Sequence, residues 1–211
     1  MDEIRYTLIS DGPSDRSLIP ILTWALREKG DVIRVQSEWA DLSRLPKPPK
    51  TLCNRILTAI DLFPCDLLFV HRDAERQAPQ RRYEEIRNAI READSQGFRM
   101  PAVCVVPVQM TEAWLLLDEN AIRGAAGNPN GKNPLSIPEL SEIEKIPDPK
   151  NLLFQILREA SGLTRRRLKK FNMSEARIRI TELVSDFSPL RELYAFQRLE
   201  KNISNTFKNW S

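Results

Sequence analysis

The residues best suited to chemistry in this sequence are acids that follow apolar stretches of strand length. They are Asp11, Asp15, Asp73, Glu75 and Glu112. Carboxylates gathered in one place repel one another, and a hard divalent cation relieves that repulsion because it prefers oxygen ligands. The pattern therefore predicts a site for Mg²⁺ or Mn²⁺ held by these acids. It also predicts that neutralising Asp73 or Glu75 stabilises the metal-free fold.

The acids differ in their expected local setting. Asp73 and Glu75 are two positions apart on an expected extended segment, so their side chains are predicted to project to the same side. Asp11 is expected at a strand end and Asp15 in the first helical turn, because Pro13 suits the start of a helix. Both pairs are thus predicted to face one site.

Ordinary structural roles stay open for the same acids. Asp15 and Glu112 suit a first helical turn, where the helix dipole favours negative charge, and Asp11 suits a turn. Asp73 and Glu75 also fit a solvated charged face. The sequence by itself does not decide between these structural roles and a metal site.

The elements that must position these acids follow a regular alternation of strand and helix patterns. Apolar runs of strand length are expected as strands, and amphipathic runs of helix length are expected as helices. The expected strands are residues 4–10, 32–39, 66–70 and 102–108, and the expected helices are residues 14–29, 51–63, 79–96 and 111–123. This order predicts an α/β fold with a mostly parallel four-stranded sheet flanked by helices. Ligands of such sheets bind at the carboxyl ends of the strands, which is where the acids fall.

Three segments are expected along the chain. Residues 1–125 form the α/β domain, residues 126–150 form a loop or lid segment rich in turn residues, and residues 151–211 form a basic helical extension packed on the same domain. Lys132 lies on the loop and is a candidate to place positive charge near a transition state. A solvated loop lysine explains the same residue.

Positive charge concentrates at the end of the sequence. Residues 151–211 hold 12 Lys and Arg and 6 Asp and Glu, whereas residues 1–150 hold 20 and 23. The densest basic run is Arg165, Arg166, Arg167, Lys169 and Lys170. Such a run suits binding to a nucleic-acid phosphate backbone without base recognition, and it equally suits a solvated helix face.

Several classes of protein are disfavoured. Cys53, Cys65 and Cys104 are an odd number at wide spacing, which fits neither a disulfide framework nor a zinc site and indicates a reducing compartment. The single histidine, His71, is expected to pack at a strand end or to orient a neighbouring acid. No leader-like start and no long apolar stretch is present, so the expectation is a cytoplasmic protein without a membrane span. Glycine-rich nucleotide-binding motifs are absent, which disfavours a nucleotide-dependent phosphotransfer domain.

Three motifs in order resemble a known family. The segments SDGPSD, DLLFVHRDAE and VPVQMTEAWLLLDENA resemble the Toprim fold, and in particular the stand-alone Toprim-like proteins related to the OLD-family nucleases of bacterial phage-defence systems. In that family the first strand ends in E-G-x-x-E, a later strand ends in D-x-D, and a further acid follows. Asp11 and Asp15 match the first motif with Asp in place of Glu, Asp73 and Glu75 match the second with a longer last acid, and Glu112 matches the third.

The resemblance implies Mg²⁺- or Mn²⁺-dependent cleavage of nucleic-acid phosphodiesters, in DNA or RNA. Asp11, Asp73 and Glu75 would hold the ions, Asp15 and Glu112 would complete their shell, and Lys132 would assist. The implied role is an antiviral defence component, and the expected partners are nucleic acid, an ATPase protein and a second copy of the chain. The alternative is a catalytically degenerate Toprim scaffold that binds a partner ATPase and does not cleave, which the Asp-for-Glu replacements favour.

Overall fold

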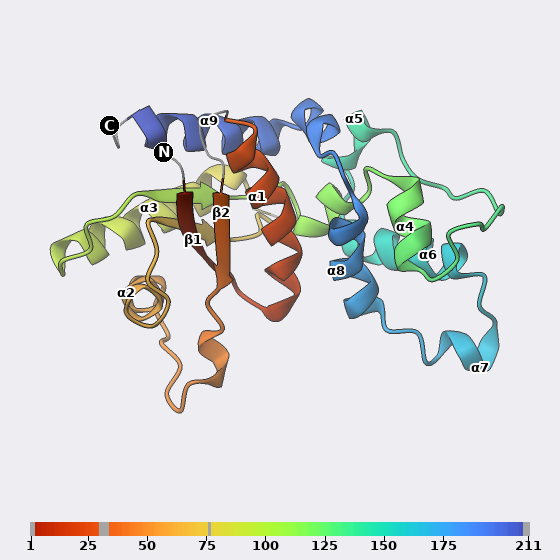
Figure 1. Ribbon diagram of the computed structural model, residues 1–211, viewed down its shortest axis with the longest axis horizontal. Helices are drawn as coiled ribbons and strands as arrows, with labels where there is room; N and C mark the ends of the chain where they lie inside the picture. The colour runs from red at the N-terminus through yellow and green to blue at the C-terminus, as the bar shows by residue number, and fades with distance from the viewer. Residues whose placement is uncertain (1–2, 30–33, 76, 209–211) are drawn as a thin grey trace.

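The computed structural model describes residues 3–29, 34–75 and 77–208. Within these residues four parallel strands form one sheet in the order β2-β1-β3-β4, which confirms the predicted α/β fold class (Figure 1). The strands are β1 (Glu3–Ile9), β2 (Arg34–Trp39), β3 (Leu67–His71) and β4 (Ala102–Val105). β3 is buried along its whole length, as expected for a central strand that reads as a continuous apolar run.

Helices cover both faces of the sheet because alternate side chains of each strand point to opposite faces. Leu67 and Phe69 pack in one apolar cluster with α1 (Leu18–Arg27) and the C-terminal helices. Leu68 and Val70 pack in a second cluster with α2 (Leu52–Leu62) and α3 (Pro79–Ser95). The sheet is therefore the middle layer of three.

The remaining helices, except the last one, extend the molecule to one side of the sheet (Figure 1). In chain order they are α4 (Glu119–Ala125), α5 (Leu140–Ile143), α6 (Pro149–Ser161), α7 (Arg165–Leu168), α8 (Met173–Leu183) and α9 (Tyr194–Lys208), with 3-10 turns η1 (Pro13–Ser17), η2 (Leu42–Arg44), η3 (Thr111–Leu115) and η4 (Ser188–Glu192). α9 returns along the sheet and packs against β4. Its first backbone amides, from Tyr194 and Ala195, donate to the carboxylate of Glu144, which caps the helix from a distant segment.

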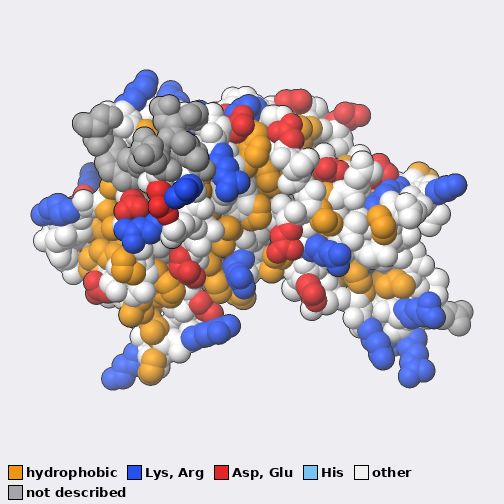
Figure 2. Space-filling model, viewed as in Figure 1, with side chains coloured by type: hydrophobic (Ala, Val, Ile, Leu, Met, Phe, Trp, Pro, Cys, Tyr) orange, Lys and Arg blue, Asp and Glu red, His pale blue; other side chains and the backbone are white. Residues whose placement is uncertain are grey.

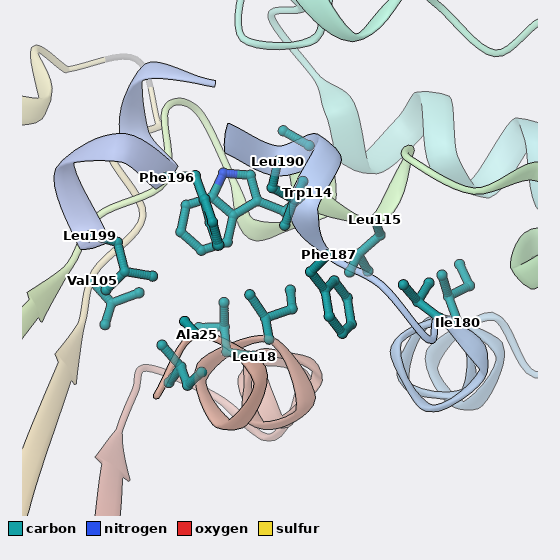
Figure 3. Close-up of a cluster of buried hydrophobic side chains, with 14 of the residues drawn as sticks. Leu18, Ala25, Val105, Trp114, Leu115, Ile180, Phe187, Leu190, Phe196 and Leu199 are labelled. Carbon is teal, nitrogen blue, oxygen red and sulfur yellow. The ribbon is translucent and has the colours of Figure 1, made fainter. Parts of the chain in front are cut away.

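The η3 turn anchors the sheet to these helices through Trp114. This side chain is fully buried, and its ring meets that of Phe196 edge-on with centroids 5.6 Å apart (Figure 3). Phe187 and Leu190 lie on the same side of the cluster (Figure 3). The core is thus continuous from β1 to α9, and Trp114 belongs to it rather than to an exposed surface.

Some predicted helix boundaries are wrong. The expected helix 111–123 is split into η3 and α4, because the side chain of Asp118 accepts a hydrogen bond from the amide of Ala121 and starts a new helix. The N-cap of α8 is Asn172, whose side chain accepts from the amide of Glu175. The expected helix end at Gly30 and strand start at Val32 lie outside the described residues.

Candidate functional site at the carboxyl edge of the sheet

The acids that follow β1 and β3 lie where an open α/β sheet usually binds its ligand. The chain passes from β1 to β2 on one side and later to β3 on the other, so the strand order reverses between β1 and β3. Ile9 is paired with Val70 in the register, which places the residues after both strands at the same edge. We call the group at this edge the edge site; its members are Asp11, Asp15, Arg55, His71, Arg72, Asp73, Glu75, Arg82, Glu85 and Thr111.

His71 occupies the centre of the edge site and lies between two carboxylates. Its side chain is 1% exposed, Nδ1 is 3.6 Å from Asp15 Oδ2, and Nε2 is 3.2 Å from Asp73 Oδ1. Burial lowers the pKa of His71, but the hydrogen bonding and charge of Asp15 and Asp73 outweigh burial and raise this pKa to about 10. His71 is therefore an imidazolium at neutral pH, and an imidazolium has no lone pair to offer a metal.

Asp73 is held in place by Thr111, a residue that the sequence did not single out. The backbone amide of Thr111 donates to Asp73 Oδ1 at 2.9 Å, and its hydroxyl donates to the same oxygen at 3.1 Å. The hydroxyl of Thr111 also lies 3.1 Å from His71 Nε2. The amide and hydroxyl of Thr111 and Nε2 of His71 all contact Oδ1 of Asp73, so the fold fixes the position of this one oxygen.

Asp15 caps the start of the 3-10 turn η1 in which it lies. Its Oδ2 accepts from the amide of Gly12 at 3.1 Å and its Oδ1 accepts from the hydroxyl of Ser14 at 3.1 Å. Burial raises the pKa of Asp15, and the hydrogen bond and charge of His71 with the local donors lower it overall. Asp15 is thus a buried, ionised partner of His71 rather than an acid open to solvent.

Asp11 is exposed but is already paired with two guanidinium groups. Its Oδ1 accepts from Arg55 Nη1 at 2.9 Å and from Arg72 Nη1 at 2.6 Å. Arg72 also contacts Glu85 of α3 at 2.9 Å. Neither arginine was predicted, because Arg55 comes from α2 and nothing in its local sequence marks it as a neighbour of Asp11.

Glu75 does not lie on an extended segment as predicted. Its φ angle is +53°, in the left-handed region, so the alternation from which a common side for Asp73 and Glu75 was predicted does not apply here. The Glu75 carboxylate is 57% exposed and lies 3.5 Å from Arg82 Nη2, while Arg82 Nε donates to the carbonyl oxygen of Asp73 at 3.0 Å. Gln109, which accepts a hydrogen bond from the Glu75 amide, also has a positive φ of 62°. Two such residues store about 1–3 kcal/mol of strain each.

Glu112 is removed from the other acids by a buried ion pair. Its carboxylate accepts a hydrogen bond from Arg177 of α8, and the two side chains are 4% and 6% exposed. The full charge of Glu112 is therefore met by one guanidinium. This pair connects η3, which carries Thr111, to α8.

The remaining predicted residues lie away from the edge site. Lys132 is exposed on the loop after α4, and Figure 1 places this loop at the far end of the helical extension from the strands. Arg166, Arg167, Lys169 and Lys170 are exposed on α7 and the turn after it, and Arg165 begins that helix. Lys and Arg side chains gather over α7 in Figure 2.

The acids of the edge site offer the oxygen ligands that a divalent metal ion prefers, but their negative charge is already paired with cationic side chains. Carboxylate oxygens suit Mg²⁺ or Mn²⁺, yet no group of three or more His, Cys, Asp and Glu side chains within the described ranges is placed to hold a metal ion. Five acids of the edge site face His71 and three arginines, so the repulsion from which a cation was inferred is largely offset by the protein. The structure shows no preformed metal centre in this part of the chain.

Comparisons of the chain with protein-family models, with curated proteins and with solved structures return no match. The Toprim resemblance therefore stays a prediction from three motifs. Among the helices that the structure describes, none has the length and apolar character needed to span a bilayer.

Proposed function

We propose that this protein is a divalent-metal-dependent, nuclease-like Toprim protein that hydrolyses nucleic-acid phosphodiesters at the edge site. One observation supports this proposal above the others: carboxylates and guanidinium groups lie side by side where the strand order reverses. Carboxylates are the ligands that Mg²⁺ prefers, and guanidinium groups bind phosphate in a planar, two-point manner. The edge site thus holds both chemical halves of a phosphodiesterase.

The pairing of these groups suggests how they would be used. Asp11 is held by Arg55 and Arg72 in the ligand-free fold. A phosphodiester that draws these arginines away leaves the carboxylate free, and a cation then restores the charge balance. Binding of the cation and binding of the phosphodiester are therefore expected to strengthen each other, which is a coupling between two ligands.

Under this proposal the residues divide into two roles. Asp11, Asp73 and Glu75 are the accessible acids that would hold Mg²⁺ or Mn²⁺, and the bound ion would activate water and stabilise the leaving oxygen. Asp15 and Glu112 instead maintain the positions of His71 and α8 through their buried contacts. The Toprim resemblance supports a cytoplasmic role in antiviral defence with a partner ATPase.

The second candidate is a Toprim scaffold that does not cleave. The same ion pairs favour it, because Arg55 and Arg72 occupy Asp11 without any ligand. In this case the pairs persist when nucleic acid is added, and the edge site serves only to hold β1, β3 and α3 together.

A cleavage assay distinguishes the two candidates. Supercoiled plasmid, linear DNA and transfer RNA are incubated with the protein with and without Mn²⁺, beside Asp73→Asn and the matched control Asp61→Asn on the exposed face of α2. The nuclease proposal predicts Mn²⁺-dependent cleavage by the parent and Asp61→Asn, and at least 100-fold less by Asp73→Asn. Equal cleavage by the two variants, or no cleavage by the parent, would contradict it.

A further inference from the structure

A second charged region lies at the far side of α8 from the edge site. A cavity of about 470 Å³ is bordered by the ends of α4 and α6, by α7 and by the first turns of α8. We call it the basic pocket; the residues that define it are Arg167, Lys170, Phe171, Asn172, Glu175 and Arg179. Two of them belong to the basic run of the sequence, whereas Arg179 joins them from the next helix.

The cations of the basic pocket are unpaired. Arg167, Lys170 and Arg179 are exposed, and none of their side chains makes a hydrogen bond or an ion pair with another residue in the described ranges. The one acid among the defining residues, Glu175, is turned toward its own helix start, where its backbone amide donates to the side-chain oxygen of Asn172 and its carboxylate accepts from the Asn172 side-chain nitrogen. The pocket therefore carries net positive charge that no described group neutralises.

Two further features suit a phosphate ester. The pocket opens at the N-terminus of the 11-residue helix α8, where the helix dipole adds to the positive charge of the three cations. Phe171, which is partly buried against the core, also lines the pocket beside the cations, and an aromatic ring in that position suits contact with a base. Cations combined with an aromatic ring are typical of surfaces that bind single-stranded nucleic acid.

We propose that the basic pocket binds a backbone phosphate of single-stranded nucleic acid, with Arg167, Lys170 and Arg179 as its ligands. This deepens the proposed function, since it places part of the substrate away from the acids of the edge site. The recognition is of phosphate and stacking and carries no base readout. It needs no divalent metal, because the pocket itself supplies the positive charge that a phosphate requires.

The test measures binding without metal in the Asp73→Asn background, so that its outcome is independent of cleavage. A fluorescein-labelled 12-nucleotide single strand is titrated onto the full chain, onto Lys170→Gln/Arg179→Gln, and onto Lys47→Gln/Lys50→Gln, which removes the same charge from an exposed loop. The proposal predicts about tenfold weaker binding by the pocket variant and a salt slope smaller by about 1.4, since each single-strand phosphate contact contributes about 0.7. The loop variant is expected to bind like the parent.

Equal affinity and equal salt slope for the pocket and loop variants would overturn the proposal. Competition identifies the source of the phosphate: neither AMP nor inorganic phosphate is expected to displace the single strand at ten times its concentration. Complete displacement by AMP would overturn the nucleic-acid assignment. Thermal unfolding of each variant, unchanged within about 2 °C, excludes misfolding as the cause.

Discussion

The edge site and the basic pocket use their charged residues in opposite ways. In the edge site Asp11 is paired with Arg72 and Arg55, and Asp73 is paired with His71. In the basic pocket Arg179 and its neighbours have no such partner among the described residues. In a paired site, a cation must replace the arginine beside the carboxylate and an anion must replace the carboxylate beside the arginine. An unpaired pocket binds an anion directly. A cluster of charged residues in a sequence therefore does not by itself reveal which charge is available.

Helix α8 connects the basic pocket to elements that carry residues of the edge site. α8 contributes Arg179 to the basic pocket and Arg177 to the buried pair with Glu112, and it packs against η1, which carries Asp15. A substitution that disturbs one end of α8 is therefore expected to affect the other end as well. The contribution of α8 to the stability of the fold is the first property to test.

The largest effect is expected from breaking the buried pair. Arg177→Ala leaves the carboxylate of Glu112 buried without a partner, and we expect the free energy of unfolding to fall by about 3–5 kcal/mol. The double variant Glu112→Leu/Arg177→Met should recover most of this loss, because an apolar pair of similar volume needs no charge partner. Urea unfolding measures both. A single variant within about 1 kcal/mol of the parent would show that Glu112 does not depend on Arg177.

The next effect is a pH dependence at His71. Its folded pKa, about 10, exceeds the ordinary value of 6.5, so its contribution to stability is fully present below about pH 6.5 and is lost as the pH rises toward 10. We expect this loss to be on the order of a few kcal/mol and to be absent from His71→Gln. Urea unfolding of both proteins from pH 6 to pH 10 isolates it, because other titrating groups are common to both. Parallel curves would contradict the charged state of His71.

A smaller effect, of opposite sign to the prediction from sequence, is expected at Asp73. Repulsion among acids predicts that Asp73→Asn stabilises the metal-free protein, whereas the structure shows Asp73 accepting from His71 and Thr111. We therefore expect the free energy of unfolding to fall by about 1–3 kcal/mol. Asp61→Asn, which has no such partners, should change it by less than about 0.5 kcal/mol. Stabilisation of the metal-free protein by Asp73→Asn would contradict this expectation and would support the prediction that the acids repel one another.

The sheet could be predicted from the sequence because its signals are local. The apolar run at residues 66–70 reads as a central strand without knowledge of its neighbours, and β3 is central and buried. Proline has no amide hydrogen to donate within a sheet, so Pro107 in the expected strand 102–108 favours an edge position or a strand end, and β4 is an edge strand that ends at Val105. The same alternation placed Asp11 and Asp73 at one edge, because parallel strands bring their carboxyl ends together.

The partners of the acids could not be predicted because they come from distant segments. Arg55 is 44 residues from Asp11, and Arg177 is 65 residues from Glu112. Both arginines lie in amphipathic helices where an arginine ordinarily faces solvent. Glu75 has a left-handed backbone conformation that its sequence does not indicate. The location of the site could therefore be predicted from the sequence, whereas the balance of its charges could not.

The most direct test of the pairing account is a titration of Mn²⁺, followed by electron paramagnetic resonance, with and without a phosphorothioate single strand that resists cleavage. We predict at least about tenfold tighter Mn²⁺ binding in the presence of the strand. Arg72→Gln, which removes one competitor from Asp11, should tighten Mn²⁺ binding without the strand and reduce the coupling. Equal Mn²⁺ affinity with and without the strand, unchanged by Arg72→Gln, would contradict the account.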